Sequence, residues 1–276
     1  MSKVPTIAFN NGVEIPQLGF GVWQVPEELV VDAVRVAIET GYRSIDTAAI
    51  YGNEEGTGRA IAESGVARDE LFVTTKLWNS EQGYDSTLAA FDESIKKLEL
   101  DYVDLYLIHW PSPHRDKYVE TWKAFEQLLN DGRVKSIGVS NFHQPHLQRL
   151  LDETDIVPVL NQIELHPYLQ QAALRTFCAE HGILTEAWSP LASGGDVLTD
   201  PLIAKLADKY GKTPAQVILR WHLQLGNVVI PKSVTPSRIK ENFEVFDFEL
   251  TAEDVAAFAP LEKGFRTGPD PDTFTA

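Results

Sequence analysis

The chain has almost no cysteine: Cys178 is the single one among 276 residues. One thiol cannot form an internal disulfide, so we expect a cytoplasmic protein that is stabilised by a packed core. No apolar run approaches the ~20 residues that a membrane-spanning helix needs, and the opening "MSKVPTIAFNNG" lacks the apolar segment of a secretory leader. These absences exclude an internal disulfide and argue against a membrane-spanning helix.

Positive charge is also scarce, because 24 Lys and Arg face 40 Asp and Glu, a net charge of −16. Such a surface repels nucleic acid and anionic membranes, so we expect neither as a partner. Against this background Lys232, Arg238 and Lys240 form a noteworthy cationic cluster. The guanidinium fork of arginine matches a phosphate group, which favours an anion site here over a merely solvated helix N-terminus.

No Pro/Gly/Ser-rich linker divides the chain, so we expect one domain over residues 1–276. A short β-rich run followed by a helical pattern recurs eight times along the sequence. The runs are predicted to end at Gly21, Asp46, Lys76, His109, Ser140, Glu164, Trp188 and Ile230. Alternating strands and helices imply a parallel sheet with right-handed crossovers, and eight units favour a closed (β/α)8 TIM barrel, an α/β fold.

Two segments lie outside these units. "TIAF" and "VEIP", separated by "NNG", predict an N-terminal β-hairpin that could plug the N-terminal end of the barrel. The irregular tail after Leu261 is predicted to be a C-terminal loop over the active face. A doubly wound dinucleotide fold is disfavoured because its G-x-G-x-x-G fingerprint is missing; Gly19 and Gly21 come nearest, but Gln24 takes the third position.

Polar and aromatic side chains gather at the predicted strand ends, where the active site of a barrel lies. They are Asp46, Tyr51 in the next loop, Lys76, His109, Trp110, Ser140, Asn141, Gln162, Glu164, Trp188, Ser189, Lys232 and Ser233. One such group could be structural, but a structural explanation for all of them is improbable.

Three of these residues suggest a proton-transfer device. The tyrosine pKa of ~10 is too high for an efficient acid near neutrality, and a nearby lysine ammonium lowers it. Asp46 can hold Lys76 charged beside Tyr51, and His109 can orient a carbonyl oxygen. No serine or cysteine is paired with a dedicated base, so proton delivery to a carbonyl is best completed by hydride from a nicotinamide.

Other functions remain open at this stage. A nucleotide-sensing protein on the same fold would need no turnover. A barrel isomerase or aldolase would use Lys76 as a Schiff base, which Asp46 disfavours by keeping the lysine protonated. We expect no metal, because His143-x-x-His146 and Cys178-x-x-His181 have no further ligand placed nearby, and a metal needs three or four.

Six motifs, in this order and spacing, carry a resemblance that spans essentially the whole chain: "IDTAAIYGNE", "TTKLW", "LIHWP", "SIGVSNF", "NQIELHPY" and "IPKS". They look like the aldo-keto reductase family, and the short loop after His109 resembles its bacterial 2,5-diketo-D-gluconate reductase subgroup. The resemblance implies NADPH-dependent reduction of aldehydes or ketones, on small keto sugars, keto acids, keto esters or aldehydes, by a monomer. It implies a catalytic tetrad of Asp46, Tyr51, Lys76 and His109, with Tyr51 as the acid.

The same resemblance implies the binding residues. Those for NADP(H) are Ser140, Asn141 and Gln162 at the nicotinamide carboxamide, Trp188 on its ring, Ser189, Leu191 and Ser193 along the pyrophosphate, Lys232, Ser233, Val234, Thr235 and Arg238 at the 2′-phosphate segment, and Glu241 and Asn242 at the adenine. Those for the carbonyl substrate are Trp23, Ala48, Trp78 and Trp110, which would line an apolar mouth with the C-terminal loop.

Overall fold

The computed structural model describes residues 4–276, so the first three residues of the expected 1–276 domain lie outside it. Eight parallel strands form one sheet with neighbours in sequence order. They are β3 (Phe20–Gly21), β4 (Ser44–Asp46), β5 (Phe72–Leu77), β6 (Leu105–Ile108), β7 (Ile137–Ser140), β8 (Leu160–Glu164), β9 (Leu184–Trp188) and β10 (Val228–Val229). Leu18 pairs in parallel with Val229 and the Gly21 amide donates to the Pro231 carbonyl at 3.2 Å, so the sheet closes on itself. The predicted (β/α)8 barrel is confirmed.

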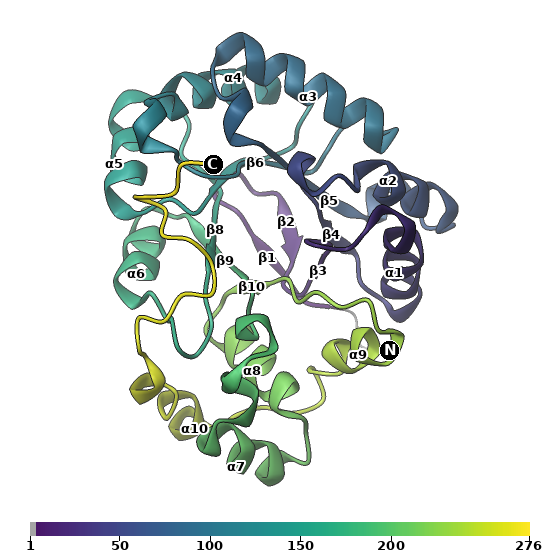
Figure 1. Ribbon diagram of the computed structural model, residues 1–276, viewed down its shortest axis with the longest axis vertical. Helices are drawn as coiled ribbons and strands as arrows, with labels where there is room; N and C mark the ends of the chain where they lie inside the picture. The colour runs from purple at the N-terminus through teal and green to yellow at the C-terminus, as the bar shows by residue number, and fades with distance from the viewer. Residues whose placement is uncertain (1–3) are drawn as a thin grey trace.

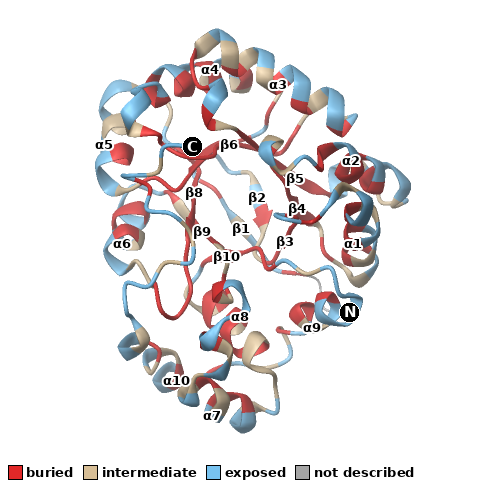
Figure 2. Cartoon of the chain, viewed as in Figure 1, coloured by how far each residue is buried: buried red, intermediate tan, exposed pale blue. Residues whose placement is uncertain are grey.

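Helices surround the strands, as Figure 1 shows. They are α1 (Glu27–Thr40), α2 (Glu54–Glu63), α3 (Tyr84–Leu98), α4 (Tyr118–Asn130), α5 (Gln144–Glu153), α6 (Ala172–Glu180), α7 (Pro201–Tyr210), α8 (Pro214–Gln224), α9 (Pro236–Phe243) and α10 (Ala252–Ala256). Figure 2 shows buried residues on the strands and on the helix sides that face them. This is the burial expected of amphipathic helices packed around a sheet.

The first helix illustrates how local sequence sets the packing. Its buried residues recur at i, i+3, i+4, i+7 and i+8: Val30, Ala33, Val34, Ala37 and Ile38. The helix ends at Gly41, whose φ of 123° is one that residues with a side chain rarely adopt. A Cβ at Gly41 would also stand 2.7 Å from the ring of Phe243, so this glycine lets α9 pack against the end of α1.

The predicted N-terminal hairpin is also confirmed: β1 (Thr6–Ala8) pairs antiparallel with β2 (Glu14–Pro16). Phe9 and Ile15 from this hairpin join a separate apolar cluster with residues of the barrel strands. The other buried members are Phe72, Leu105, Leu107, Val159, Leu160 and Val228. Most of these lie in the first halves of their strands, so the hairpin closes the N-terminal end of the barrel.

Prolines follow the ends of two elements. α10 stops at Ala256 and a 3-10 turn, Ala259–Leu261, follows it. Pro260 lies in this turn and disfavours the helical conformation of the residue before it. The strand predicted to end at Ile230 is β10, which ends at Val229, since Pro231 has no N–H to extend the ladder.

The chain after Leu261 has neither helix nor strand, as predicted, and Figure 1 shows it in yellow crossing the rim of the barrel. Of the helices in residues 4–276, none combines the length and the apolar character that crossing a membrane requires.

The hairpin plug leads to a stability prediction. Ile15 is fully buried in the closing cluster, so Ile15→Ala should lower the free energy of unfolding by about 2–5 kcal/mol. Urea denaturation followed by circular dichroism measures this. Thr6→Ala, at an exposed position of the same hairpin, is the control and should change stability by less than about 0.5 kcal/mol. Equal small effects of both changes would contradict the plug.

Candidate active site

Four polar side chains meet at the C-terminal ends of three neighbouring strands. Asp46 is the last residue of β4, Lys76 lies on β5 and His109 follows β6 directly. Tyr51 closes the short 3-10 turn Ala49–Tyr51 that follows β4. Parallel strands bring their carboxyl ends to one rim, so the barrel collects residues that are up to 63 positions apart in the sequence, from 46 to 109.

Lys76 is at the centre of this group and its side chain is fully buried. Its ammonium donates to Asp46 Oδ1 at 2.5 Å, to the Thr47 carbonyl at 2.9 Å and to the Tyr51 hydroxyl at 3.4 Å. Three acceptors match the three protons of the ammonium group. The lysine is therefore held in one orientation with its charge directed at the phenol.

Burial dominates the electrostatics of the tyrosine. Burial raises the pKa of Tyr51, and the Lys76 charge opposes this rise without cancelling it. Lysine thus acts in the predicted sense, but the predicted net lowering of the phenol pKa is wrong in this structure. For Lys76 itself, burial lowers the pKa, whereas Asp46 and Tyr51 together raise it above its ordinary value. The ammonium stays charged.

His109 is neutral near pH 7, because burial and the nearby Lys76 charge lower its pKa well below 6.5. Its ring meets those of Tyr51 and Trp78 edge-on, with centroids 5.6 and 5.2 Å apart. Among residues 4–276 its Nδ1 is buried with no hydrogen-bond partner. A neutral imidazole beside the phenol can bond a ligand oxygen without adding charge.

Aromatic residues pack beside this group. Trp110 is buried, Trp78 is partly buried and both contact Phe274 of the tail, at centroid distances of 4.5 and 6.4 Å. Ala48 is buried, whereas Trp23 is 46% exposed at the surface. Phe274 was missed in the sequence because the tail has no periodic pattern that would place it.

The residues expected at the nicotinamide lie on the adjoining part of the rim, at the ends of β7, β8 and β9. Trp188 Nε1 donates to Asn141 Oδ1 at 2.8 Å, and Asn141 Nδ2 donates to the His109 carbonyl at 2.9 Å. Ser140 Oγ donates to the Gln162 carbonyl at 2.9 Å. These contacts fix the indole and amide groups on one side of the tetrad.

Gln162 makes a further contact that the sequence did not predict. Its Nε2 donates to Asp46 Oδ2 at 2.9 Å and to Glu186 Oε2 at 2.7 Å. Glu186 was missed, although a signal existed: it is an acid in the apolar run of β9, two residues before Trp188. Alternation along a strand puts these two residues on the same face.

The loop expected along the pyrophosphate has an unusual backbone. Ser189, Ala192 and Ser193 all have positive φ, of 46°, 46° and 55°. Each such residue costs about 1 kcal/mol or more, and such strain clusters at functional sites. Successive amides in conformations of this kind can form a concave anion site. Leu191 lies between these residues and packs against the main core.

The cationic segment follows β10. Lys232 and Arg238 are exposed, and neither forms an ion pair with any other residue of the described 4–276 range. Val234 and Thr235 are exposed between them, and the Thr235 amide donates to Ser233 Oγ at 3.1 Å. The adenine candidates lie on α9: Glu241 accepts a hydrogen bond from Thr213 at 2.8 Å, and Asn242 is buried.

Glu164, the last residue of β8, anchors the tail. Its Oε1 accepts from the Thr267 amide at 2.5 Å and from the Thr267 hydroxyl at 2.7 Å, and its Oε2 accepts from the Gly268 amide at 3.2 Å. A Cβ at Gly268 would stand 2.5 Å from the Trp188 ring. Only glycine therefore lets the tail pass this close to the indole.

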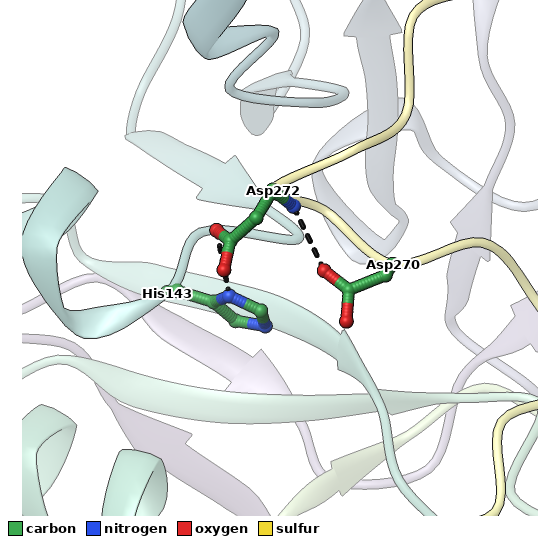
Figure 3. Close-up of side chains that lie close together, drawn as sticks. All are labelled: His143, Asp270 and Asp272. Atoms are coloured by element: carbon green, nitrogen blue, oxygen red, sulfur yellow. Dashed lines mark hydrogen bonds and ion pairs between the residues drawn. The ribbon is translucent and has the colours of Figure 1, made fainter.

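A second tail anchor lies at the start of α5 (Figure 3). His143 Nδ1 is 2.9 Å from Asp272 Oδ1, the Asp272 amide donates to Asp270 at 2.9 Å, and His146 Nε2 is 3.5 Å from Asp272.

The sequence argument against a metal, that no further ligand lies near the two histidines, is therefore wrong. However, Arg266 donates to His143 Nε2 at 3.2 Å, which leaves the ring proton on Nδ1 for Asp272. The guanidinium thus supplies the positive charge, and the cluster works as a hydrogen-bonded anchor.

Comparison with known proteins agrees with this geometry. Residues 17–263 match the model of the family described as Aldo/keto reductase family. The chain is 60% identical to an aldo-keto reductase of Mycolicibacterium smegmatis over 98% of both chains, and 56% identical to methylglyoxal reductase DkgA of Escherichia coli over 99% of both. The crystal structure of Gox0644 in its apo form matches with a TM-score of 0.95 and 52% identity over 99% of both chains.

Two further solved structures resemble the chain. A mutant of Gox0644 in complex with NADPH has a TM-score of 0.95 and 52% identity over 99% of both chains. An aldo/keto reductase from Brucella melitensis has a TM-score of 0.91 and 59% identity, over 94% of this chain and 100% of its own. On the family model and on relatives that match over their full length, this chain belongs to the aldo-keto reductase family.

Proposed function

We propose that small oxo-aldehydes are the substrates of this protein, which is an NADPH-dependent reductase that converts aldehydes or ketones to alcohols. One observation supports this reaction above all: the Lys76 ammonium donates a hydrogen bond to Asp46 and another to the Tyr51 hydroxyl, which lies 3.4 Å away. A neutral His109 stands beside the same phenol. This is a proton donor with a fixed counter-charge, next to a group that can orient a carbonyl oxygen.

The residues present fit NADPH. Two unpaired cations in a chain of net charge −16 suit the 2′-phosphate, and the strained loop at residues 189–193 suits the pyrophosphate. Ser140, Asn141 and Trp188 would hold the nicotinamide beside the tetrad. When bound, NADPH supplies the hydride.

Residues of the chain itself donate the proton and stabilise the charge that remains. Tyr51 donates its hydroxyl proton to the carbonyl oxygen as negative charge develops there, and the Lys76 charge stabilises the phenolate that remains. Asp46 keeps that charge in place, and the His109 N–H can direct the carbonyl oxygen toward the phenol. A raised phenol pKa does not obstruct this step, because an alkoxide is a much stronger base than a phenolate.

The hydrogen bonds and the charge of Lys76 also disfavour the Schiff-base alternative. An imine forms only from a neutral amine, and Asp46 and Tyr51 raise the pKa of Lys76. Attack on a carbonyl would also break all three hydrogen bonds of the ammonium group. The geometry favours a lysine that acts through its charge.

Substrate size is inferred from the mouth of the barrel. Trp78 packs against His109, and Phe274 of the tail packs against both Trp78 and Trp110, so bulky rings limit the size of a substrate beside the histidine. The relative from Escherichia coli is named a methylglyoxal reductase, which supports a compact, reactive dicarbonyl as substrate. A cytoplasmic monomer completes the proposal; the buried, single Cys178 is suited to a reducing compartment.

The direct test of this function removes the proton donor. Tyr51→Phe should lower kcat for methylglyoxal reduction by about 10²–10⁴-fold while the Kd for NADPH changes little, because the ring remains and only the acid is lost. Stopped-flow or steady-state NADPH oxidation and fluorescence titration measure the two quantities. Tyr84→Phe, at a partly exposed site on α3, is the matched control and should behave as wild type. Undiminished turnover by Tyr51→Phe would contradict the assignment of Tyr51 as the proton donor.

The pH dependence follows from the tyrosine and the histidine. The pKa of Tyr51 is raised above the ordinary tyrosine value of ~10, so kcat for reduction should persist beyond that pH before it falls. The lowered pKa of His109 predicts no loss of rate as the pH falls through 6.5. Oxidation of the alcohol needs the phenolate and should rise through the alkaline range. Profiles of kcat in both directions measure this; a reduction rate that halves near pH 6.5 would show a charged histidine instead.

A further inference from the structure

Four interior side chains from four strands form one continuous hydrogen-bonded chain. It runs from Lys76 on β5 to Asp46 on β4, then through Gln162 on β8 to Glu186 on β9. The amide of Gln162 has two N–H groups, and each carboxyl group takes one, at 2.9 and 2.7 Å. The two oxygens of Asp46 are thus divided: Oδ1 faces Lys76 and Oδ2 faces Gln162.

Glu186 is the ionisable member of this chain that the proton-transfer scheme leaves unused. It is 2% exposed and lies opposite Gln162 in the register between β8 and β9. An acid buried in a barrel is costly, and an apolar residue of similar volume often serves stability as well or better. A purely structural role therefore explains its presence poorly, while its link to the tetrad residue Asp46 suggests a functional one.

We propose that Glu186 is a positioning residue of the reductase reaction, which holds one N–H of the Gln162 amide so that the other fixes Asp46 against Lys76. This inference rests on the proposed function. Without Glu186 the terminal amide torsion of Gln162 is free to turn, because such torsions are broad. Asp46 then loses its second constraint, and with it the orientation of the ammonium toward Tyr51.

The charge of Glu186 has a separate effect. Burial and the nearby Asp46 charge raise the pKa of Glu186 to about 8, so it is a neutral acid at pH 7 and Asp46 alone balances Lys76. The titratable groups around it are Asp46, Lys76 and Tyr51. Above pH ~8 an ionised Glu186 raises the pKa of both Tyr51 and Lys76, which extends the protonated form of the phenol to higher pH.

Two variants of the full chain separate geometry from charge. Glu186→Leu removes the acceptor, so kcat should fall by about ten- to a hundredfold across the pH range, with little change in KM for NADPH. Glu186→Gln keeps an acceptor but has no charge at any pH. It should lose less activity than the leucine variant, and the alkaline fall of its kcat should begin at lower pH than in the wild type.

The measurement is the kcat and KM profile from pH 6 to 11, with NADPH and methylglyoxal. The control is Asp104→Asn, a buried carboxyl group just before β6 that pairs with Arg68 and Lys135 far from the tetrad. It should lower the thermal midpoint without moving the pH profile.

The proposal is overturned if both Glu186 variants keep the kcat and the alkaline limb of the wild type. It is also overturned if Glu186→Leu loses activity only in proportion to its loss of folded protein. If the leucine variant does not fold, the pH profile of the glutamine variant still decides. A wild-type protein that reduces no carbonyl compound would refute the proposed function itself, which is a different result.

Discussion

The ion pair between Lys76 and Asp46, buried at one end of the barrel, is the interaction on which the rest of the site depends. Taking two charges out of water is expensive, and the pair persists only where other polar groups complete its hydrogen bonds. Here the Thr47 carbonyl, the Tyr51 hydroxyl and the Gln162 amide do so. Because these groups come from different strands of the closed barrel and from a loop at its rim, the barrel register is itself a condition for the chemistry.

The two ends of the barrel differ in the residues that line them, but both keep water away from the ion pair. The hairpin closes one end with apolar residues such as Ile15, which keeps water from entering beneath the ion pair. At the other end the tail is hydrogen-bonded to Glu164 and to His143. Its Phe274 packs against Trp78 and Trp110. Exclusion of water strengthens every charge interaction inside the site.

Much of this was predictable from the sequence, and the parts that were not share a physical cause. Strand ends and helix stripes are local patterns, so the barrel and the sites of Asp46 and Lys76 could be predicted. The contact of His143 with Asp272 joins residues 129 positions apart, and Glu186 matters only through the register of β9 with β8. The direction of the Tyr51 pKa shift depends on the balance between burial, which raises the pKa, and the Lys76 charge, which lowers it. The sequence alone does not give that balance.

The central claim is that the Lys76 charge, held by Asp46, makes the buried phenol of Tyr51 a better acid than burial alone would allow. It is tested most directly by titrating Tyr51 in the wild type and in Lys76→Met, using NMR of tyrosine labelled at Cζ. Tyr51→Phe assigns the resonance. The account predicts a higher Tyr51 pKa in the Lys76→Met variant than in the wild type. An unchanged or lower pKa in that variant would contradict it.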